Sequence, residues 1–300
     1  MITRRSFLKF VSGSFLAGLA VIGYGTGVEA MAQPRVTRYR LAPSNWPNGL
    51  KIRAVLLADF HACDPWMSVG RMTQICDQAN ALEGDMILLL GDYVAGTKLV
   101  TGMIDSSVWA KVLSRLKAPL GVHAVLGNHD HWQDLPFQRD PTVKTFAERA
   151  LTDVGIPVYI NRAVQLKKDG TQFWLAGLGD QMALRPGKSF GRKNWGGIDD
   201  LDAVLASVTD EAPIILMAHE PDIFVGMNPR VSVTLSGHTH GGQINIMGWI
   251  PFLPSRYGGR YARGWFRENN TELVVSAGLG CTGIPLRIGA RPEIVVLEIG

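Results

Sequence analysis

The chain has 300 residues, which is enough for one large globular domain. Its formal net charge of +4 is small, and about half of it comes from three basic residues and one acid in the first 32 positions. Nucleic-acid-binding domains usually carry a stronger basic bias, so we expect no nucleic-acid partner. The three cysteines are an odd number, and this excludes a framework made only of paired disulfides.

The first 32 residues have the pattern of an export signal. Arg4 and Arg5 form a twin-arginine pair, and an uncharged stretch follows from Phe10 to Val28. The run Ala-Met-Ala at residues 30–32 then has the small-residue spacing of a cleavage site. We therefore predict a twin-arginine signal peptide over residues 1–32, with the twin-arginine export machinery as a partner, and a single domain over residues 33–300.

A membrane anchor is the alternative interpretation of the same segment. Eighteen or more apolar residues can span a bilayer, so the stretch can also remain attached as an N-terminal anchor. Five glycines between Gly13 and Gly27 lower its hydrophobicity and favour export. Either route predicts a location in the periplasm or on the outer face of the cytoplasmic membrane or cell wall, where the membrane or cell envelope is a candidate contact surface.

Beyond residue 33, short apolar runs alternate with amphipathic segments. The amphipathic segments predict helices over residues 67–82, 107–117, 142–154 and 199–208. Runs rich in Val, Ile and Leu predict strands over residues 52–57, 86–90, 122–126, 173–176, 214–217, 231–235, 273–276 and 293–299. This alternation predicts a layered α/β fold.

Five of the predicted strands are followed directly by side chains of the kind that bind metals. The motifs are Asp-Phe-His from residue 59, Gly-Asp from 91, Gly-Asn-His-Asp from 127, Ala-His-Glu from 218 and Gly-His-Thr-His-Gly-Gly-Gln from 237. Sites in open α/β sheets assemble at the carboxyl ends of the strands, so we expect these motifs to meet. Five of the seven histidines lie in them: His61, His129, His219, His238 and His240.

The chemistry of these side chains predicts the metals. Imidazole, carboxylate and amide ligands suit borderline divalent ions such as Mn, Fe or Zn, and a thiolate zinc site is excluded because the chain has no Cys-x-x-Cys. Two divalent ions about 3.5–4 Å apart can hold a phosphoryl group for in-line displacement. We expect two divalent metal ions as cofactors.

The ordered set of motifs resembles the calcineurin-like metallophosphoesterases over nearly all of residues 33–300. Residues 237–243, 254–258 and 278–287 look like the bacterial branch of that superfamily that contains YkuE and YaeI, whose relatives include UDP-2,3-diacylglucosamine pyrophosphatases of lipid A synthesis. The resemblance implies an α/β fold with two facing mixed β-sheets flanked by helices, a four-layer α/β/β/α sandwich.

The resemblance also implies a role for each motif residue. Asp92 would bridge the two ions, a metal-bridging hydroxide would attack phosphorus, and His129 would be the general acid that protonates the leaving group. One ion would be held by Asp59, His61 and His240, and the other by Asn128, His219 and His238.

Three further residues each have two interpretations. Asp130 is a candidate catalytic residue that orients the His129 ring, or it is a loop cap. Arg256 and Arg287 belong to segments rich in arginine and aromatic residues, and their guanidinium groups match phosphate oxygens. They are candidate substrate residues, or they are residues of the rim and the packed interior.

The predicted function is that of a dinuclear metal-dependent phosphoesterase acting on phosphodiester or pyrophosphate bonds. One alternative is a lipid A enzyme of the UDP-2,3-diacylglucosamine pyrophosphatase type, and another is a non-catalytic metal-binding envelope protein. A P-loop is excluded because Met182 stands where its first glycine belongs. A serine-hydrolase elbow is excluded because Val274 stands in the position of a required glycine.

Overall fold

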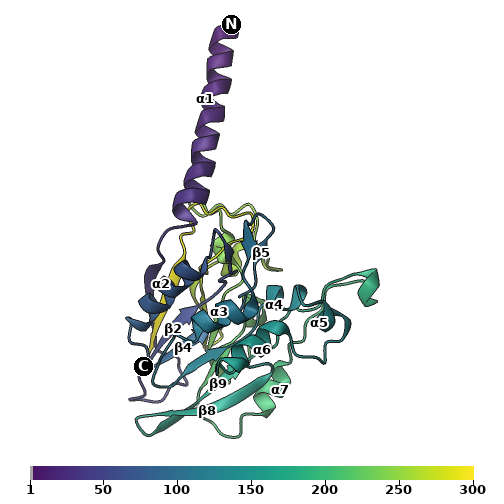
Figure 1. Cartoon of the computed structure of the whole chain (residues 1–300). Coiled ribbons are helices and arrows are strands. Elements are labelled where there is room, and N and C mark those ends of the chain that lie inside the picture. The colour runs from purple at the N-terminus through teal and green to yellow at the C-terminus, as the bar shows by residue number, and fades with distance from the viewer. Residues whose placement is uncertain (1–2) are drawn as a thin grey trace.

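Two β-sheets face each other in the computed structural model, which describes residues 3–300 (Figure 1). The first sheet has the strand order β1-β15-β2-β4-β7, and the second has the order β12-β13-β11-β10-β9-β8. The first comprises β1 (Arg35–Leu41), β15 (Glu293–Ile299), β2 (Ile52–Leu57), β4 (Met86–Leu89) and β7 (Val122–Ala124). The second comprises β12 (Gly264–Glu268), β13 (Thr271–Val275), β11 (Val231–Ser236), β10 (Ile214–Met217), β9 (Thr171–Gly177) and β8 (Arg162–Lys168).

Both sheets are mixed. Strands β2, β4 and β7 run parallel in the first sheet, and β15 pairs antiparallel with β2. Strands β9, β10, β11 and β13 run parallel in the second sheet, with β8 and β12 antiparallel at its two edges. The parallel strands are almost entirely buried, which explains their continuous apolar sequences.

Helices cover the outer faces of both sheets. The first sheet packs against α2 (Val69–Asn80), α3 (Ser106–Leu113) and α6 (Phe146–Asp153), and the second packs against α7 (Leu201–Ala206) and the short helix η3 (Pro221–Phe224). In β2 the side chains alternate, so that Val55 and Leu57 face the helices while Ala54 and Leu56 pack against the second sheet. The predicted fold of two facing mixed sheets flanked by helices is confirmed.

Of the strands in the two facing sheets, the prediction missed three, β1, β8 and β12. All three lie at sheet edges and carry exposed or half-buried polar side chains, so they lack a continuous apolar run. Short elements complete the loops near the carboxyl ends of the central strands. They are β3 (Cys63–Asp64), β5 (Gly96–Thr97), β6 (Gly102–Met103), β14 (Thr282–Gly283), α4 (Asn128–Trp132) and α5 (Leu135–Arg139).

The N-terminal helix α1 (Arg4–Gly23) projects away from the body and continues as a π-helical turn to Glu29 (Figure 1). None of the residues of α1 is buried. The segment Arg4–Glu29 is long and apolar enough to cross a membrane, and its place near the N-terminus is also typical of a signal sequence.

The three cysteines are buried and unpaired. Burial raises the pKa of the Cys76 thiol to about 12, as expected for a cysteine that acts as a small apolar residue.

Candidate metal centre

The loops after β2, β4, β7, β10 and β11 converge at one edge of the two facing sheets, and they carry all seven predicted metal ligands. Every one of these side chains is buried, and none belongs to a residue more than 5 % exposed. The ligands are Asp59, His61, Asp92, Asn128, His219, His238 and His240.

One group of donor atoms forms around Asp59, His61 and His240. Their donor atoms all lie within 4.8 Å of one another. The Nε2 atoms of His61 and His240 are 3.1 Å apart, and Nε2 of His240 is 3.7 Å from Oδ1 of Asp59. Three donors converging on one point are sufficient to hold a metal ion.

A second group forms around His219 and His238. Nδ1 of His238 lies 2.9 Å from the amide oxygen of Asn128, and the donor atoms of His219, His238 and Glu220 lie within 4.8 Å of one another. Glu220 was not among the predicted ligands, although it follows His219 directly in the sequence motif.

Asp92 lies between the two groups. Its Oδ2 is 3.5 Å from Nε2 of His61 and 3.3 Å from Nε2 of His219, while its Oδ1 accepts a hydrogen bond from the backbone N–H of His129. One carboxylate thus reaches a histidine of each group.

Backbone carbonyls determine which ring nitrogen three of these histidines present. The Nδ1–H groups of His61 and His219 donate to the carbonyls of Val94 and Leu90, at 2.8 and 2.7 Å, and this leaves each Nε2 lone pair directed at the centre. His238 is reversed, because its Nε2–H donates to the carbonyl of Pro254 at 2.8 Å and leaves Nδ1 unprotonated beside Oδ1 of Asn128. In these tautomers each ring can present a lone pair, as metal ligands do. Asp92 raises the pKa of His219 well above its usual value despite burial, so a metal ion bound there would displace the proton from this ring.

Three buried atoms of the two donor groups have no hydrogen-bond partner among residues 3–300. They are Oδ2 of Asp59, Nε2 of His219 and Oε1 of Glu220. Leaving such groups without a partner costs about 1–3 kcal/mol each, so unpaired acceptors at one centre indicate a missing electrophile. The donors present therefore fit divalent cations.

The backbone at the centre is strained. Asp59, His61, Asp92, His238 and His240 all have φ between 50° and 68°, in the left-handed region that non-glycine residues rarely occupy. Such conformations cost about 1–3 kcal/mol each and collect at functional sites. A Cβ atom on the glycine at position 127 would lie 2.4 Å from Oδ1 of Asp92, which explains why this position is glycine.

The electrostatics of the two carboxylates also favour bound cations. Burial raises the pKa of Asp59 to about 7. Burial acts in the same direction on Asp92, but the neighbouring His219, His129 and His61 hold the pKa of Asp92 well below its usual range. The two acids thus differ in ionisation near neutral pH, and a divalent cation between them would favour the ionised form of both.

His129 lies beside the centre rather than in it. Its Nε2 is 3.1 Å from Oγ1 of Thr282, and its ring packs edge-on against His61 with the centroids 5.0 Å apart. Thr282 was not predicted as a partner, although it belongs to the segment 278–287 that carried the resemblance.

Asp130 does not orient the His129 ring, and its predicted catalytic role is corrected. Its carboxylate accepts four backbone N–H groups, at 2.9–3.1 Å, from Gly127 and from Asp92, Tyr93 and Val94. Asp130 therefore caps α4 and ties the loop after β4 to the loop after β7. This is the alternative role that its position in the sequence allowed.

Arg287 is corrected as well, because its side chain is completely buried. Its guanidinium donates to the carbonyls of Ala277, Gly280 and Ala290, and to Nδ1 of His240 at 3.2 Å. It contacts the ring of His240, a predicted ligand, and it cannot contact a substrate directly because it is buried.

A cavity of about 560 Å³ lies over the centre. Arg256 is exposed and does not line it. The walls are mostly apolar, and His129 and four of the seven predicted metal ligands, Asp92, Asn128, His238 and His240, also line the cavity. Its apolar lining includes Trp132, Met182, Pro251, Phe252, Ile284 and Leu286.

Comparison with known proteins agrees with this geometry. The family model of the calcineurin-like phosphoesterases matches residues 52–242. The chain is 29% identical to the uncharacterized metallophosphoesterase YkuE of Bacillus subtilis, over 99% of this chain and 97% of that protein. It is 27% identical to the phosphodiesterase YaeI of Escherichia coli, over the whole length of both chains.

A solved structure of a dimetal phosphatase from Danio rerio is similar at a TM-score of 0.41 and 14% identity, covering 76% of this chain and 88% of that chain. Because the family model covers more than half of the sequence and spans the metal-ligand motifs of the loops after β2 to β11, the chain belongs to the calcineurin-like phosphoesterase family.

Proposed function

We propose that the protein is a dinuclear metal-dependent hydrolase of phosphodiester or pyrophosphate bonds. The observation that carries this proposal is the position of Asp92 between two groups of buried donors, one at Asp59, His61 and His240 and one at Asn128, His219 and His238. When bound there, two divalent ions such as Mn, Fe or Zn would activate water as the nucleophile and offset the negative charge on the phosphoryl oxygens.

The chain itself supplies the proton for the leaving group. His129 lines the cavity, and its Nε2 faces the cavity wall at Thr282. Burial lowers the pKa of His129 to about 3, so the ring is neutral near pH 7 without substrate. A phosphoryl group in the cavity places negative charge beside the ring and raises this pKa, which allows His129 to act as a general acid.

The contacts behind the ligands hold the geometry. Asp130 fixes the loop that carries Asp92, and Arg287 fixes the ring of His240. A site that only stored metal would not need a further histidine facing the cavity, so His129 favours catalysis over a non-catalytic role. The name of the Escherichia coli relative supports phosphodiester bonds as the first substrates to test.

The test is a screen of the purified full chain with Mn, Zn and Mg on aryl monoesters, aryl diesters and UDP-sugar pyrophosphates. We expect metal-dependent hydrolysis of diesters or pyrophosphates that Asp92→Asn abolishes. Absence of hydrolysis at full metal occupancy would contradict the proposal.

A further inference from the structure

The base of the N-terminal helix packs against the segment that borders the cavity. The backbone N–H of Arg287 donates to the carbonyl of Gly25 at 3.1 Å. A Cβ atom at Gly25 would lie 2.4 Å from Cδ1 of Leu286, and Leu286 lines the cavity. The base of α1 therefore lies beside a residue that lines the cavity, and Figure 1 shows the helix leaving the body at the end where β5 lies.

Exposed apolar side chains surround the same end. We define the apolar rim as Ile246, Met247, Trp249, Phe252 and Ile284, all of them exposed, with Met247 fully exposed and Phe252 73 % exposed. Ile246 and Met247 directly follow Asn245, whose backbone N–H donates to the carbonyl of Ile288 at 2.8 Å. Ile288 is the neighbour of Arg287, which contacts the base of α1 at Gly25.

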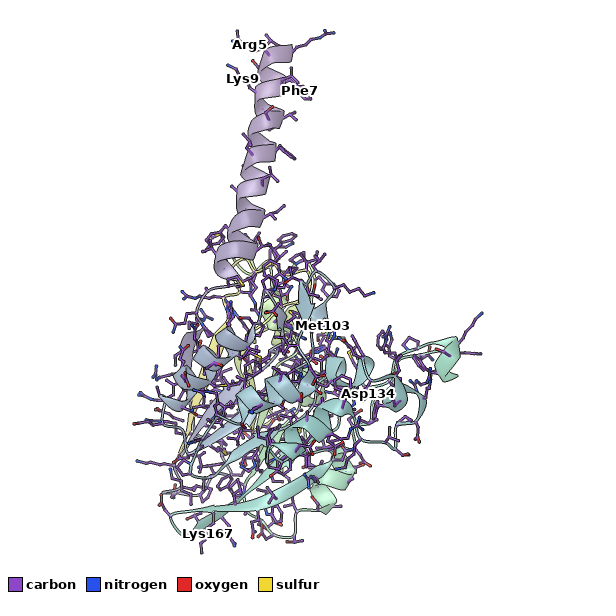
Figure 2. The ribbon with its side chains drawn as sticks, in the orientation of Figure 1. Arg5, Phe7, Lys9, Met103, Asp134 and Lys167 are labelled. Atoms are coloured by element: carbon purple, nitrogen blue, oxygen red, sulfur yellow. The ribbon has the colours of Figure 1, made fainter. Side chains whose placement is uncertain are left out.

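Two further exposed apolar residues lie in the segment between β4 and α3. Leu99 and Met103 are each 59 % exposed, and Figure 2 places Met103 just below the base of α1 and Lys167 at the opposite end of the body. Exposed apolar residues that gather at one end of a molecule mark an interaction surface rather than ordinary scatter.

The helix beside the rim identifies the partner as a membrane. Arg4–Glu29 has 26 residues, or about 39 Å at 1.5 Å per residue, against about 30 Å for the hydrocarbon core of a bilayer. Its only basic residues are Arg4, Arg5 and Lys9. Figure 2 shows Arg5 and Lys9 at the end of the helix far from the body, and basic residues favour the cytoplasmic side. The body would then lie outside, with its apolar rim facing the outer leaflet.

The contacts of residues 30–32 argue that the helix stays attached. Ala30 is only 4 % exposed, and the guanidinium of Arg71 donates to the carbonyls of Ala30 and Ala32 at 3.0 and 3.1 Å. A protease needs an exposed, extended segment. At this predicted cleavage site Met31 and Gln33 are exposed, but the backbone of Ala30 and Ala32 is held against the folded body by Arg71. Export in the folded state would leave α1 in place.

The charge near the rim suits an anionic bilayer. Residues 231–267 include most of the rim and contain no acid, and Lys98 is exposed next to Leu99. Basic residues close to a membrane surface are attracted to anionic headgroups.

We propose that the apolar rim docks into the outer leaflet of the membrane that α1 spans, so that the cavity receives phosphoesters carried by lipids. The substrate part of this inference rests on the proposed function. The apolar lining of the cavity then holds part of the lipid chain while the phosphoryl group reaches the metal centre.

Trp249 reports on docking directly. The full chain is placed in nanodiscs of phosphatidylethanolamine and phosphatidylglycerol whose acyl chains carry bromine, which quenches tryptophan fluorescence at the depth of the hydrocarbon. We expect Trp249→Phe to remove most of the quenching. Trp265→Phe is the matched control, because Trp265 is 46 % exposed on the edge strand β12 of the second sheet and does not line the cavity. Equal quenching of the wild type and Trp249→Phe would overturn the docking proposal.

Two substrates that share the p-nitrophenol leaving group test whether docking gives the cavity access to phosphoesters carried by lipids. The first is p-nitrophenyl hexadecyl phosphate in vesicles of the same lipids, and the second is soluble p-nitrophenyl methyl phosphate. The double variant Met247→Ser/Trp249→Ser should raise KM for the vesicle substrate by roughly tenfold or more and leave the soluble substrate unchanged.

Leu135→Ser is the control for this pair, because Leu135 is 50 % exposed beside Asp134, away from the base of α1 (Figure 2). Thermal unfolding verifies that each variant is folded. If the wild type hydrolyses neither ester, the proposed function fails. If it hydrolyses both and the double variant has no selective effect, only the lipid inference fails.

Discussion

The guanidinium of Arg287 donates a hydrogen bond to Nδ1 of His240 across 3.2 Å. His61 and His219 use the same ring atom in the opposite sense, because there Nδ1–H donates to a backbone carbonyl. Burial, together with the neighbouring His61 and Arg287, holds the pKa of His240 well below its usual range. The ring is therefore neutral, and the contact with Arg287 fixes its orientation.

We expect Arg287→Met to lower both stability and metal occupancy. The change leaves the carbonyls of Ala277, Gly280 and Ala290 without their donor, at a cost of about 3 kcal/mol in the free energy of unfolding. Arg287→Lys should recover part of the stability but not the bond to His240, because an ammonium lacks the guanidinium fork. Urea unfolding and metal analysis measure the two effects. Full metal content and activity in Arg287→Lys would contradict the positioning role.

Asp92→Asn should reduce metal content and hydrolysis together. Its Oδ2 reaches a histidine of each donor group, and a neutral amide attracts cations much less strongly than a carboxylate. His240→Ala should weaken mainly the group that contains Asp59 and His61. Metal titration of each variant, followed by activity at limiting metal, distinguishes the two patterns. Near-normal activity of Asp92→Asn at limiting metal would refute the dinuclear assignment.

His129→Ala should keep both metals. Its loss of kcat should be largest for substrates whose leaving group needs a proton to depart. On alkyl esters, whose leaving group is basic, we expect a loss of roughly 10²–10⁴ in kcat. On p-nitrophenyl esters the loss should be far smaller, because the leaving group departs without protonation. Thr282→Val, which removes the hydroxyl 3.1 Å from Nε2, should show the same trend more weakly. Equal losses of His129→Ala on both esters would reduce His129 to a structural role.

Acid should destabilise the protein through His131. Burial lowers the pKa of His131 to about 4, against about 6.5 in an unfolded chain, and neither ring nitrogen has a partner among residues 3–300. Between these values the unfolded state binds more protons. The stabilisation is therefore complete above pH 6.5 and falls as the pH drops toward 4.

The matched variant for this effect is His131→Phe, which keeps an aromatic ring against Phe137 and removes the titration. From pH 7 to pH 5 the wild type should lose about 2 kcal/mol through this group, and the variant should not. Urea unfolding at the two pH values measures the difference. The same pH dependence in both proteins would show that His131 is not the group that titrates.

Replacing both Arg4 and Arg5 by lysine tests the export route. The charge is kept, but the guanidinium pair that the twin-arginine receptor reads is lost. We expect the double variant to accumulate inside the cell, folded and active. Fractionation of cells and an activity assay follow its location, and unchanged delivery to the envelope would point to a different route.

The local sequence determined the central strands and the residues that follow them. Each buried parallel strand requires a continuous apolar run, and β2, β4, β10 and β11 have such runs within a few neighbouring residues. Because those strands end at one edge of the fold, the motifs Asp59–His61 and Gly237–Gln243 were sufficient to predict that their side chains meet. The apolar runs and the motifs that follow them each lie within a few neighbouring residues, so they can be recognised in the sequence.

Tertiary structure alone decided the roles of Asp130, Arg287 and the base of α1. The sequence predicts no helix near Asp130, so it does not identify this residue as a helix cap. Its four N–H partners come from two separate loops. Arg287 looks like a surface arginine until its carbonyl partners and His240, which is 47 positions away, are brought around it. Burial and hydrogen bonding between distant segments are properties of the folded chain, so no local pattern of residues can encode which of two polar roles a side chain takes.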